Sequence, residues 1–157
     1  LFWIFDNDHF LLNTLGMSGA WSSEQPKNTR VRVSFDTGNP VYFMDPRGFG
    51  TLKVIYGRTA FLKKLESLGP DMLTEPPSLE VFTARLDTKP NWTICKALMD
   101  QSVVSGIGSR TLRKIVEASL VDEDRIIGSL SSSEIEKLYI FAKKVLAKLY
   151  QDNLHES

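Results

Sequence analysis

The sequence has little cysteine, little histidine and no net charge. Its single cysteine, Cys95, permits no internal disulfide, and with only two histidines the chain lacks the ligands of a structural zinc site. We therefore expect no metal and no cofactor. Because 19 Lys and Arg residues balance 19 Asp and Glu residues, overall charge does not indicate a nucleic-acid partner. Any such indication has to come from local arrangement.

Long apolar runs are also absent. The apolar opening, residues 1–5, stops at Asp6, which makes it too short for a membrane span or a signal peptide, so we expect no membrane partner. A chain of 157 residues with 42% hydrophobic residues can bury one ordinary core or two small ones. Because the chain begins directly in an apolar segment without an initiating Met, we expect it to be a fragment of a longer protein.

Alternation of apolar and polar residues dominates roughly the first sixty positions. Val31, Val33 and Phe35 alternate with polar neighbours, and residues 36–40 supply turn chemistry before the apolar residues 41–43. This pattern predicts a β-hairpin. Further strands are predicted over residues 1–5, 10–15 and 51–56. Together they predict part of a β-sandwich with Gly-rich loops at one end.

From about residue 59 the apolar residues follow helical spacing. Helices are predicted over residues 61–65, 79–86, 92–100, 110–120 and 133–152. Ser131 and Glu134 have the spacing of a capping box before the last helix. A Pro-rich stretch after the first helix indicates a domain boundary. The predicted fold class is therefore α+β, with part of a β-sandwich over residues 1–66, a linker over 67–78 and a helical domain over 79–157.

The most specific segment, residues 99–109, joins two predicted helices through a Gly-containing turn. Glycines allow the backbone to approach a ligand closely, and the amides at the start of the next helix form an anion site to which a DNA phosphate fits. The alternative is a helix-to-helix turn that needs glycine for its geometry and binds nothing. Spacing alone leaves both interpretations open.

Four motifs in order resemble the formamidopyrimidine-DNA glycosylase and endonuclease VIII family. Residues 98–108, Leu-Met-Asp-Gln-Ser-Val-Val-Ser-Gly-Ile-Gly, resemble the helix–two-turn–helix signature of that family. The other three are the strand-end loop Leu15–Gly19, the Asp-Pro-Arg-x-Phe-Gly loop Asp45–Gly50 and the interdomain segment Leu68–Asp71. The resemblance covers nearly the whole chain, and it implies a β-sandwich followed by a helix–two-turn–helix DNA-binding domain.

The resemblance also implies roles for residues in two of these loops. Members of the family rotate a damaged nucleotide out of the duplex and fill the vacated space with a Met, an Arg and a Phe. By motif these residues are Met17, Arg47 and Phe49. Met would be an adaptable filler, Phe a wedge between bases and Arg a planar donor to the orphaned base. Without the resemblance, the favoured interpretation is that Met17 and Phe49 are core residues and Arg47 is a surface cation.

The helical signature implies a second set of contacts, to DNA phosphates. The predicted phosphate-binding residues are Gly106, Ile107, Gly108, Ser109 and Lys96. Lys96 lies one turn before the Gly-containing segment, where the family often has Ile-Lys rather than the Ile94-Cys95-Lys96 of this sequence. A solvated helix lysine is the alternative for that position.

The chain departs from the family at the residues that perform its chemistry. The family's nucleophile is an N-terminal proline amine, helped by the adjacent Glu and by a Lys before the strand that leads into the Leu-Gly-Met loop. None of these is present, so no catalytic residue is predicted, and we expect them to lie outside the chain, as we expect of the family's C-terminal finger. Within the signature, Ser109 stands for the usual Asn, and Lys114 stands for a Glu.

Three hypotheses about function follow. The first is the central part of a base-excision-repair DNA glycosylase and AP lyase that excises oxidised bases. The second is a non-catalytic remnant that binds damaged DNA, which Ser109 and Lys114 favour. The third, a scaffold or RNA-binding domain with a similar helical hairpin, does not need residues such as Met17 and Arg47 in Gly-flanked loops. The expected partner is double-stranded DNA with an oxidised base or an abasic site, bound by a monomer.

Overall fold

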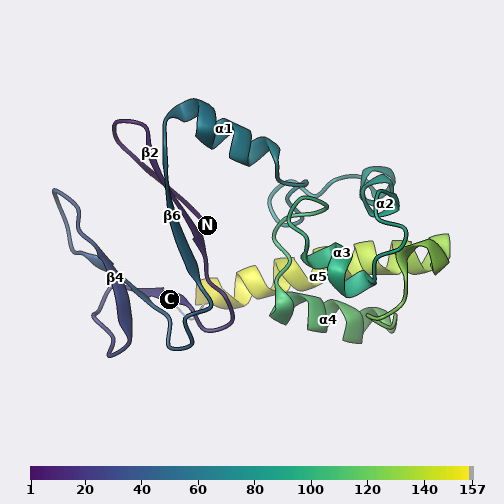
Figure 1. The fold of residues 1–157 in the computed structure, drawn as a ribbon. Coiled ribbons are helices and arrows are strands. Elements are labelled where there is room, and N and C mark those ends of the chain that lie inside the picture. Colours follow the sequence, from purple (N-terminus) through teal and green to yellow (C-terminus); the bar gives the residue numbers. More distant parts are fainter. Residues whose placement is uncertain (156–157) are drawn as a thin grey trace. The chain divides into compact units, whose positions relative to one another are not determined.

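The computed structural model describes residues 1–155, and the chain divides into two compact units, Leu1–Leu65 and Glu66–Ser157 (Figure 1). The first unit contains all the strands of the described chain and the second contains most of the helices. The architecture is therefore mixed, with strands followed by helices.

The first unit is built from two small antiparallel sheets. One has the order β1-β2-β6 and the other the order β3-β5-β4. Their strands are β1 (Phe2–Phe5), β2 (His9–Thr14), β3 (Ala20–Ser22), β4 (Thr29–Val33), β5 (Val41–Met44) and β6 (Thr51–Tyr56). Asn7 and Asp8 form the tight turn between β1 and β2, and both have positive φ angles, 60° and 55°. Such angles match the right-handed twist of the flanking strands.

Aromatic side chains form most of the core of this unit. Phe10 stacks on Phe61 of helix α1 (Arg58–Glu66), with ring centroids 4.0 Å apart. Because successive residues of a strand point to opposite faces, Trp3 lies on the other face from Phe2, and it meets Trp21 of the second sheet at 4.7 Å. The first sheet therefore buries one face under α1 and the other against the second sheet.

The second unit is a group of helices around one apolar core. Its helices are α2 (Leu79–Asp87), α3 (Ile94–Met99), α4 (Ser109–Ser119), the 3-10 turn η1 (Ile127–Ser129) and α5 (Ser132–His155). Fully buried side chains from every one of these elements meet in the core, among them Phe82, Leu98, Ile115, Ile127 and Leu138. Met72, from the predicted linker, is also in this core at 1% exposure.

Side chains cap three of these helices at their N-termini. Ser78 accepts a hydrogen bond from the amide of Val81 before α2, and Thr93 accepts one from Lys96 before α3. The predicted capping box before α5 is confirmed, because Ser131 Oγ accepts from the amide of Glu134 and the Glu134 carboxylate accepts from the amide of Ser131. That amide, followed by Arg125, lowers the pKa of Glu134 to about 2.

Most predicted elements are present, with differences at their ends. Strand β4 begins and ends two residues before the predicted range 31–35, because Thr29 pairs with Met44 across a bulge. The predicted helix 92–100 begins only at Ile94, since Thr93 serves as its cap. Strand β3 was not predicted. Its three residues are too few for alternation to be visible, and pairing with β5 defines it.

None of the helices within residues 1–155 combines the length and the apolar character that a membrane crossing needs.

Leu120, the C-cap residue that follows α4, adopts a left-handed conformation with φ 56° and is 91% exposed. A side chain costs about 1–2 kcal/mol in this conformation, and Leu120 recovers little of that cost by burial. We therefore expect Leu120→Gly to raise the free energy of unfolding by about 1 kcal/mol, measured by urea denaturation followed by circular dichroism. Leu120→Ala retains a Cβ and is the control. Equal stability of the two variants would contradict a backbone origin of the effect.

Candidate nucleic-acid interface

Two Gly-flanked loops of the first unit lie directly against each other. They are the predicted strand-end loop Leu15–Gly19 and the loop Asp45–Gly50. Gly16 has a φ of 62°, and a Cβ placed on it would lie 2.7 Å from the carbonyl carbon of Phe49. Real side chains do not tolerate such a distance, so glycine is required for the close approach of the two backbones.

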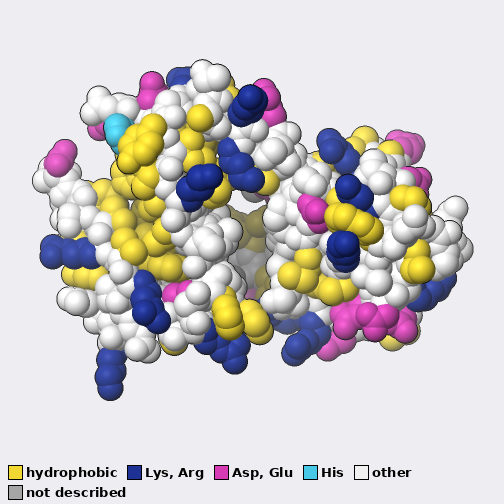
Figure 2. Space-filling model, in the orientation of Figure 1, with side chains coloured by type: hydrophobic (Ala, Val, Ile, Leu, Met, Phe, Trp, Pro, Cys, Tyr) yellow, Lys and Arg dark blue, Asp and Glu magenta, His cyan; other side chains and the backbone are white. Residues whose placement is uncertain are grey.

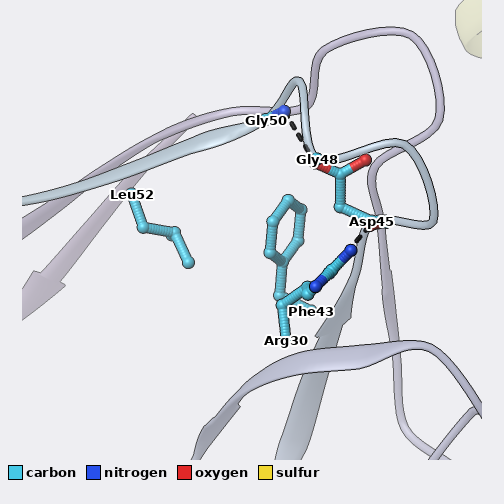
Figure 3. A pocket seen from close by; sticks show the side chains of 6 residues that line it. All are labelled: Arg30, Phe43, Asp45, Gly48, Gly50 and Leu52. Atoms are coloured by element: carbon cyan, nitrogen blue, oxygen red, sulfur yellow. Dashed lines mark hydrogen bonds between the residues drawn. The ribbon is translucent and has the colours of Figure 1, made fainter.

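A buried carboxylate, that of Asp45, joins the two loops. Its Oδ2 accepts a hydrogen bond of 2.7 Å from the amide of Gly50, which Figure 3 shows, and its Oδ1 accepts one of 2.9 Å from Ser18 Oγ. Ser18 Oγ in turn accepts from the amide of Arg47 at 3.4 Å. The Gly50 amide, with further help from Ser18, holds the pKa of Asp45 below its ordinary value although burial opposes this. Asp45 therefore stays ionised and fixes both loops.

Arg30 supports the same loop from below. Its Nε donates a hydrogen bond of 3.0 Å to the carbonyl oxygen of Asp45. Together with Phe43 and Leu52 it lines a shallow cavity under the loop (Figure 3). Sequence reasoning assigned no role to Ser18, Arg30 or Asp45. Ser18 lies in the motif Leu15–Gly19 and Asp45 lies in the motif Asp45–Gly50. Their presence in these motifs was the one signal in the sequence that could have identified them.

The braced loops present three predicted site residues to solvent. Met17 is 61% exposed and Phe49 is 62% exposed, so neither is a core residue. Arg47 is also exposed, and its Nη1 lies 3.9 Å from the sulfur of Met17. The structure thus brings Met17 and Arg47 together, and the backbone of Phe49 itself packs on Gly16. A thioether, a guanidinium and an aromatic ring stand on one pair of rigid loops.

In the second unit, Gln101 organises the predicted hairpin between α3 and α4. Its side-chain oxygen accepts from the amide of Gly106 at 3.1 Å, and its amide nitrogen donates to the carbonyl of Ile107 at 2.9 Å. Gly106 has a φ of 95°, which a residue with a side chain rarely adopts. One exposed side chain, that of Gln101, therefore holds the backbone of the hairpin.

The start of α4 leaves backbone donors free. Gly108 occupies the cap position and offers no side-chain acceptor, and the first turn contains no acidic residue. Ser109 begins the helix and is exposed, as are Arg110 and Lys114. Free amides with cationic neighbours suit an anion. Ile107 differs from its predicted neighbours, because its side chain is 1% exposed in the core and only its backbone could reach a phosphate.

Lys96 is exposed on α3, and its Nζ lies 4.1 Å from the centre of the Trp92 ring. Positive side chains do not gather into one continuous patch on the face that Figure 2 shows. The local arrangement of backbone amides and single cations therefore matters more than overall charge. Within residues 1–155, no group of His, Cys, Asp and Glu side chains is arranged to hold a metal ion.

Comparison with known proteins identifies relatives of this chain. A sequence model of the formamidopyrimidine-DNA glycosylase N-terminal domain matches residues 1–52. A formamidopyrimidine-DNA glycosylase of Oceanobacillus iheyensis is 32% identical over 146 residues, which are 89% of this chain and 52% of the relative. The chain thus spans about half the length of the curated relatives it matches.

Solved structures give the same result for the fold. The crystal structure of the MutM (Fpg) protein of Thermus thermophilus matches with a TM-score of 0.75 at 28% identity, over 91% of this chain and 53% of that one. A Lactococcus lactis formamidopyrimidine-DNA glycosylase, non-covalently bound to DNA that contains an AP site, also has a TM-score of 0.75. At 20% identity, over 94% of this chain and 58% of that one, it supports the fold alone.

Sequence and fold therefore agree on one class of protein, the DNA glycosylases that carry this domain. The chain is similar to formamidopyrimidine-DNA glycosylases over most of its length, and its residues 1–52 match their N-terminal domain.

The bracing by Asp45 predicts a dependence on pH. Because the pKa of Asp45 is lowered in the folded state, its carboxylate stabilises the loops fully above its ordinary pKa of about 4. This contribution is lost as pH falls through the lower folded-state value. We expect the proton chemical shift of the Gly50 amide, measured by NMR, to titrate with Asp45 in that acidic window.

Two variants separate this bracing from general acid effects. Asp45→Asn should move the Gly50 amide signal at neutral pH and abolish its titration, because the amide side chain carries no charge. Asp36→Asn changes an exposed carboxylate in the turn between β4 and β5 and should leave the Gly50 titration as it is. The bracing would be disproved by a Gly50 signal that titrates equally in the Asp45 variant.

Proposed function

We propose that the protein is a base-excision-repair DNA glycosylase and AP lyase, and that this chain binds double-stranded DNA at an oxidised base or an abasic site. One observation carries the proposal. Met17, Arg47 and Phe49 are exposed on two loops that a buried carboxylate holds together. Apolar side chains such as those of Met17 and Phe49 are unfavourable in water, and they would be buried on entering a gap in a base stack.

The proposed roles follow from the chemistry of the three side chains. When a nucleotide leaves the duplex, the opposite base loses its hydrogen-bond partner and the neighbouring bases lose a stacking partner. The Phe49 ring can wedge between bases, and the flexible thioether of Met17 can fill an irregular gap. The Arg47 guanidinium offers planar donors to the orphaned base. Its contact with Met17 supports a concerted entry of the two side chains.

We infer that the second unit provides the phosphate contacts. In this interpretation the two sheets belong to a β-sandwich over residues 1–66, residues 67–78 form a linker, and α3 and α4 form the helix–two-turn–helix element of the domain 79–157. The amides after Gly106, together with Ser109, would receive a backbone phosphate at the uncapped start of α4. Such contacts position the protein without reading the sequence.

A non-catalytic damaged-DNA-binding protein is the second candidate. Lys114 favours it, because a cation stands exposed on α4 where the family usually has a carboxylate. Ser109 supports phosphate binding through its hydroxyl in either case. Both candidates predict the same binding surface and differ in whether the whole protein cuts DNA at the lesion.

The void-filling role predicts a selective effect of Arg47→Ala. We expect the variant to lose roughly tenfold in preference for an abasic-site duplex over an undamaged duplex, because an orphaned base is present only at the lesion. Affinities for both duplexes would be measured by fluorescence anisotropy at two salt concentrations.

Arg32→Ala is the matched control. Arg32 is an exposed arginine of β4, and its removal changes the net charge equally. It should weaken binding to both duplexes by the same factor, if at all. If Arg47→Ala also weakened both duplexes equally, Arg47 would be a general phosphate contact and the void-filling role would be wrong.

A further inference from the structure

Two lysines of the second unit face the same indole ring. Lys96, on α3, places its Nζ 4.1 Å from the centre of the Trp92 ring. Lys89, which follows α2, places its Nζ 4.7 Å from the same centre. The π system of an indole attracts ammonium groups, so one ring holds two like charges within about 9 Å of each other.

The fold, rather than the lysines, fixes the position of this ring. The amide of Trp92 donates to the carbonyl of Lys89 at 3.0 Å, and the carbonyl of Trp92 accepts from the amide of Ile127 at 2.9 Å. The half-buried Trp92 side chain also packs against the core of the second unit. Trp92 is therefore a rigid platform on which two flexible side chains come to rest.

The two ammonium groups keep their hydrogen-bonding capacity. In the part of the chain that the structure describes, neither Lys89 nor Lys96 donates a side-chain hydrogen bond or forms a salt bridge. Lys143, by contrast, donates to the hydroxyl of Tyr139. The pKa of the Asp100 carboxyl is lowered mainly by hydrogen bonds from Ser102. The charges of Lys89 and Lys96 lower it further at longer range. Asp100 Oδ1 is already occupied by Ser102. The ammonium protons thus remain available to an external acceptor.

We propose that Lys89, Trp92 and Lys96 form a clamp for a backbone phosphate of duplex DNA. A phosphodiester carries one negative charge and accepts charge-assisted hydrogen bonds from ammonium groups. The ring is the positioning element, because it confines both ammonium groups before the phosphate arrives. A stacked base would have to compete with two ammonium groups for this ring, whereas a phosphate makes use of both of them. This proposal rests on the proposed function, since it takes the same DNA as its partner.

The salt dependence of DNA binding tests the clamp. Each phosphate contact contributes about 0.9 to the slope of log affinity against log salt concentration. Because the two lysines share one phosphate, we expect the Lys89→Gln/Lys96→Gln double variant to lower the magnitude of that slope by about 0.9 on an undamaged duplex. At about 0.1 M salt this corresponds to a loss of about one order of magnitude in affinity. The ratio of affinities for abasic-site and undamaged duplexes should stay unchanged, because phosphates are present in both.

The control is the Lys137→Gln/Lys148→Gln double variant. Among the residues that the structure describes, these exposed lysines of α5 face no aromatic ring, and their removal changes the net charge by the same amount. A slope that falls equally in both double variants would show a general charge effect and would overturn the clamp. An unchanged slope in the Lys89/Lys96 variant would overturn it as well.

Variants of the ring test the positioning role separately. Trp92→Leu keeps both charges and removes the π face, so affinity should fall several-fold while circular dichroism shows an intact fold. Trp92→Phe retains a smaller π face and most of the packing, and should bind with intermediate affinity. If the Leu variant does not fold, the Phe variant decides. Binding by Trp92→Phe at the wild-type level would show that the ring does not position the lysines.

The same measurements separate the clamp from the proposed function. A wild-type chain that binds neither duplex would overturn both. A wild-type chain that prefers the abasic-site duplex through Arg47, together with lysine variants that match the control, would overturn the clamp alone.

Discussion

Asp45 holds a negative charge inside the first unit, and the arrangement of the candidate site depends on how that charge is stabilised. A buried carboxylate is costly unless donors surround it, and here the donors are the Gly50 amide and the Ser18 hydroxyl, one from each loop. Neither loop can therefore move without leaving the charge unpaired. The result is a rigid base from which Met17 and Phe49 extend into solvent. Rigidity of the two loops matters because a backbone that is already ordered loses little conformational entropy when DNA binds.

The second unit follows the same principle with a neutral side chain. Gln101 uses both ends of its amide to hold the turn between α3 and α4, and the free amides at the start of α4 are thereby fixed in direction. Trp92 does the same for two lysine side chains. In each unit, one side chain with satisfied contacts positions outer groups that solvent can reach. Such outer groups are what a polyanionic partner would satisfy.

Local patterns in the sequence predicted most elements, because alternation and helical spacing report directly on which face is buried. They failed for the three-residue strand β3, which is too short to show alternation and is formed only through its pairing with β5. Exposure of Met17 and Phe49 followed from the resemblance to the family, since apolar residues by themselves favour a core position. The bridge from Asp45 to Ser18 spans 27 positions, and nothing local in the sequence indicates it. The shared ring of Trp92 was equally invisible, because a turn and a helix start separate its two lysines.

The most direct test is an NMR titration of the isotopically labelled 157-residue chain with a duplex that contains one abasic site. We expect the largest changes at the backbone amides of Met17, Arg47 and Phe49 and at those of residues 106–109, with smaller changes at the first group when the duplex is undamaged. Changes confined to other residues, or identical responses of the three loop residues to both duplexes, would contradict the account.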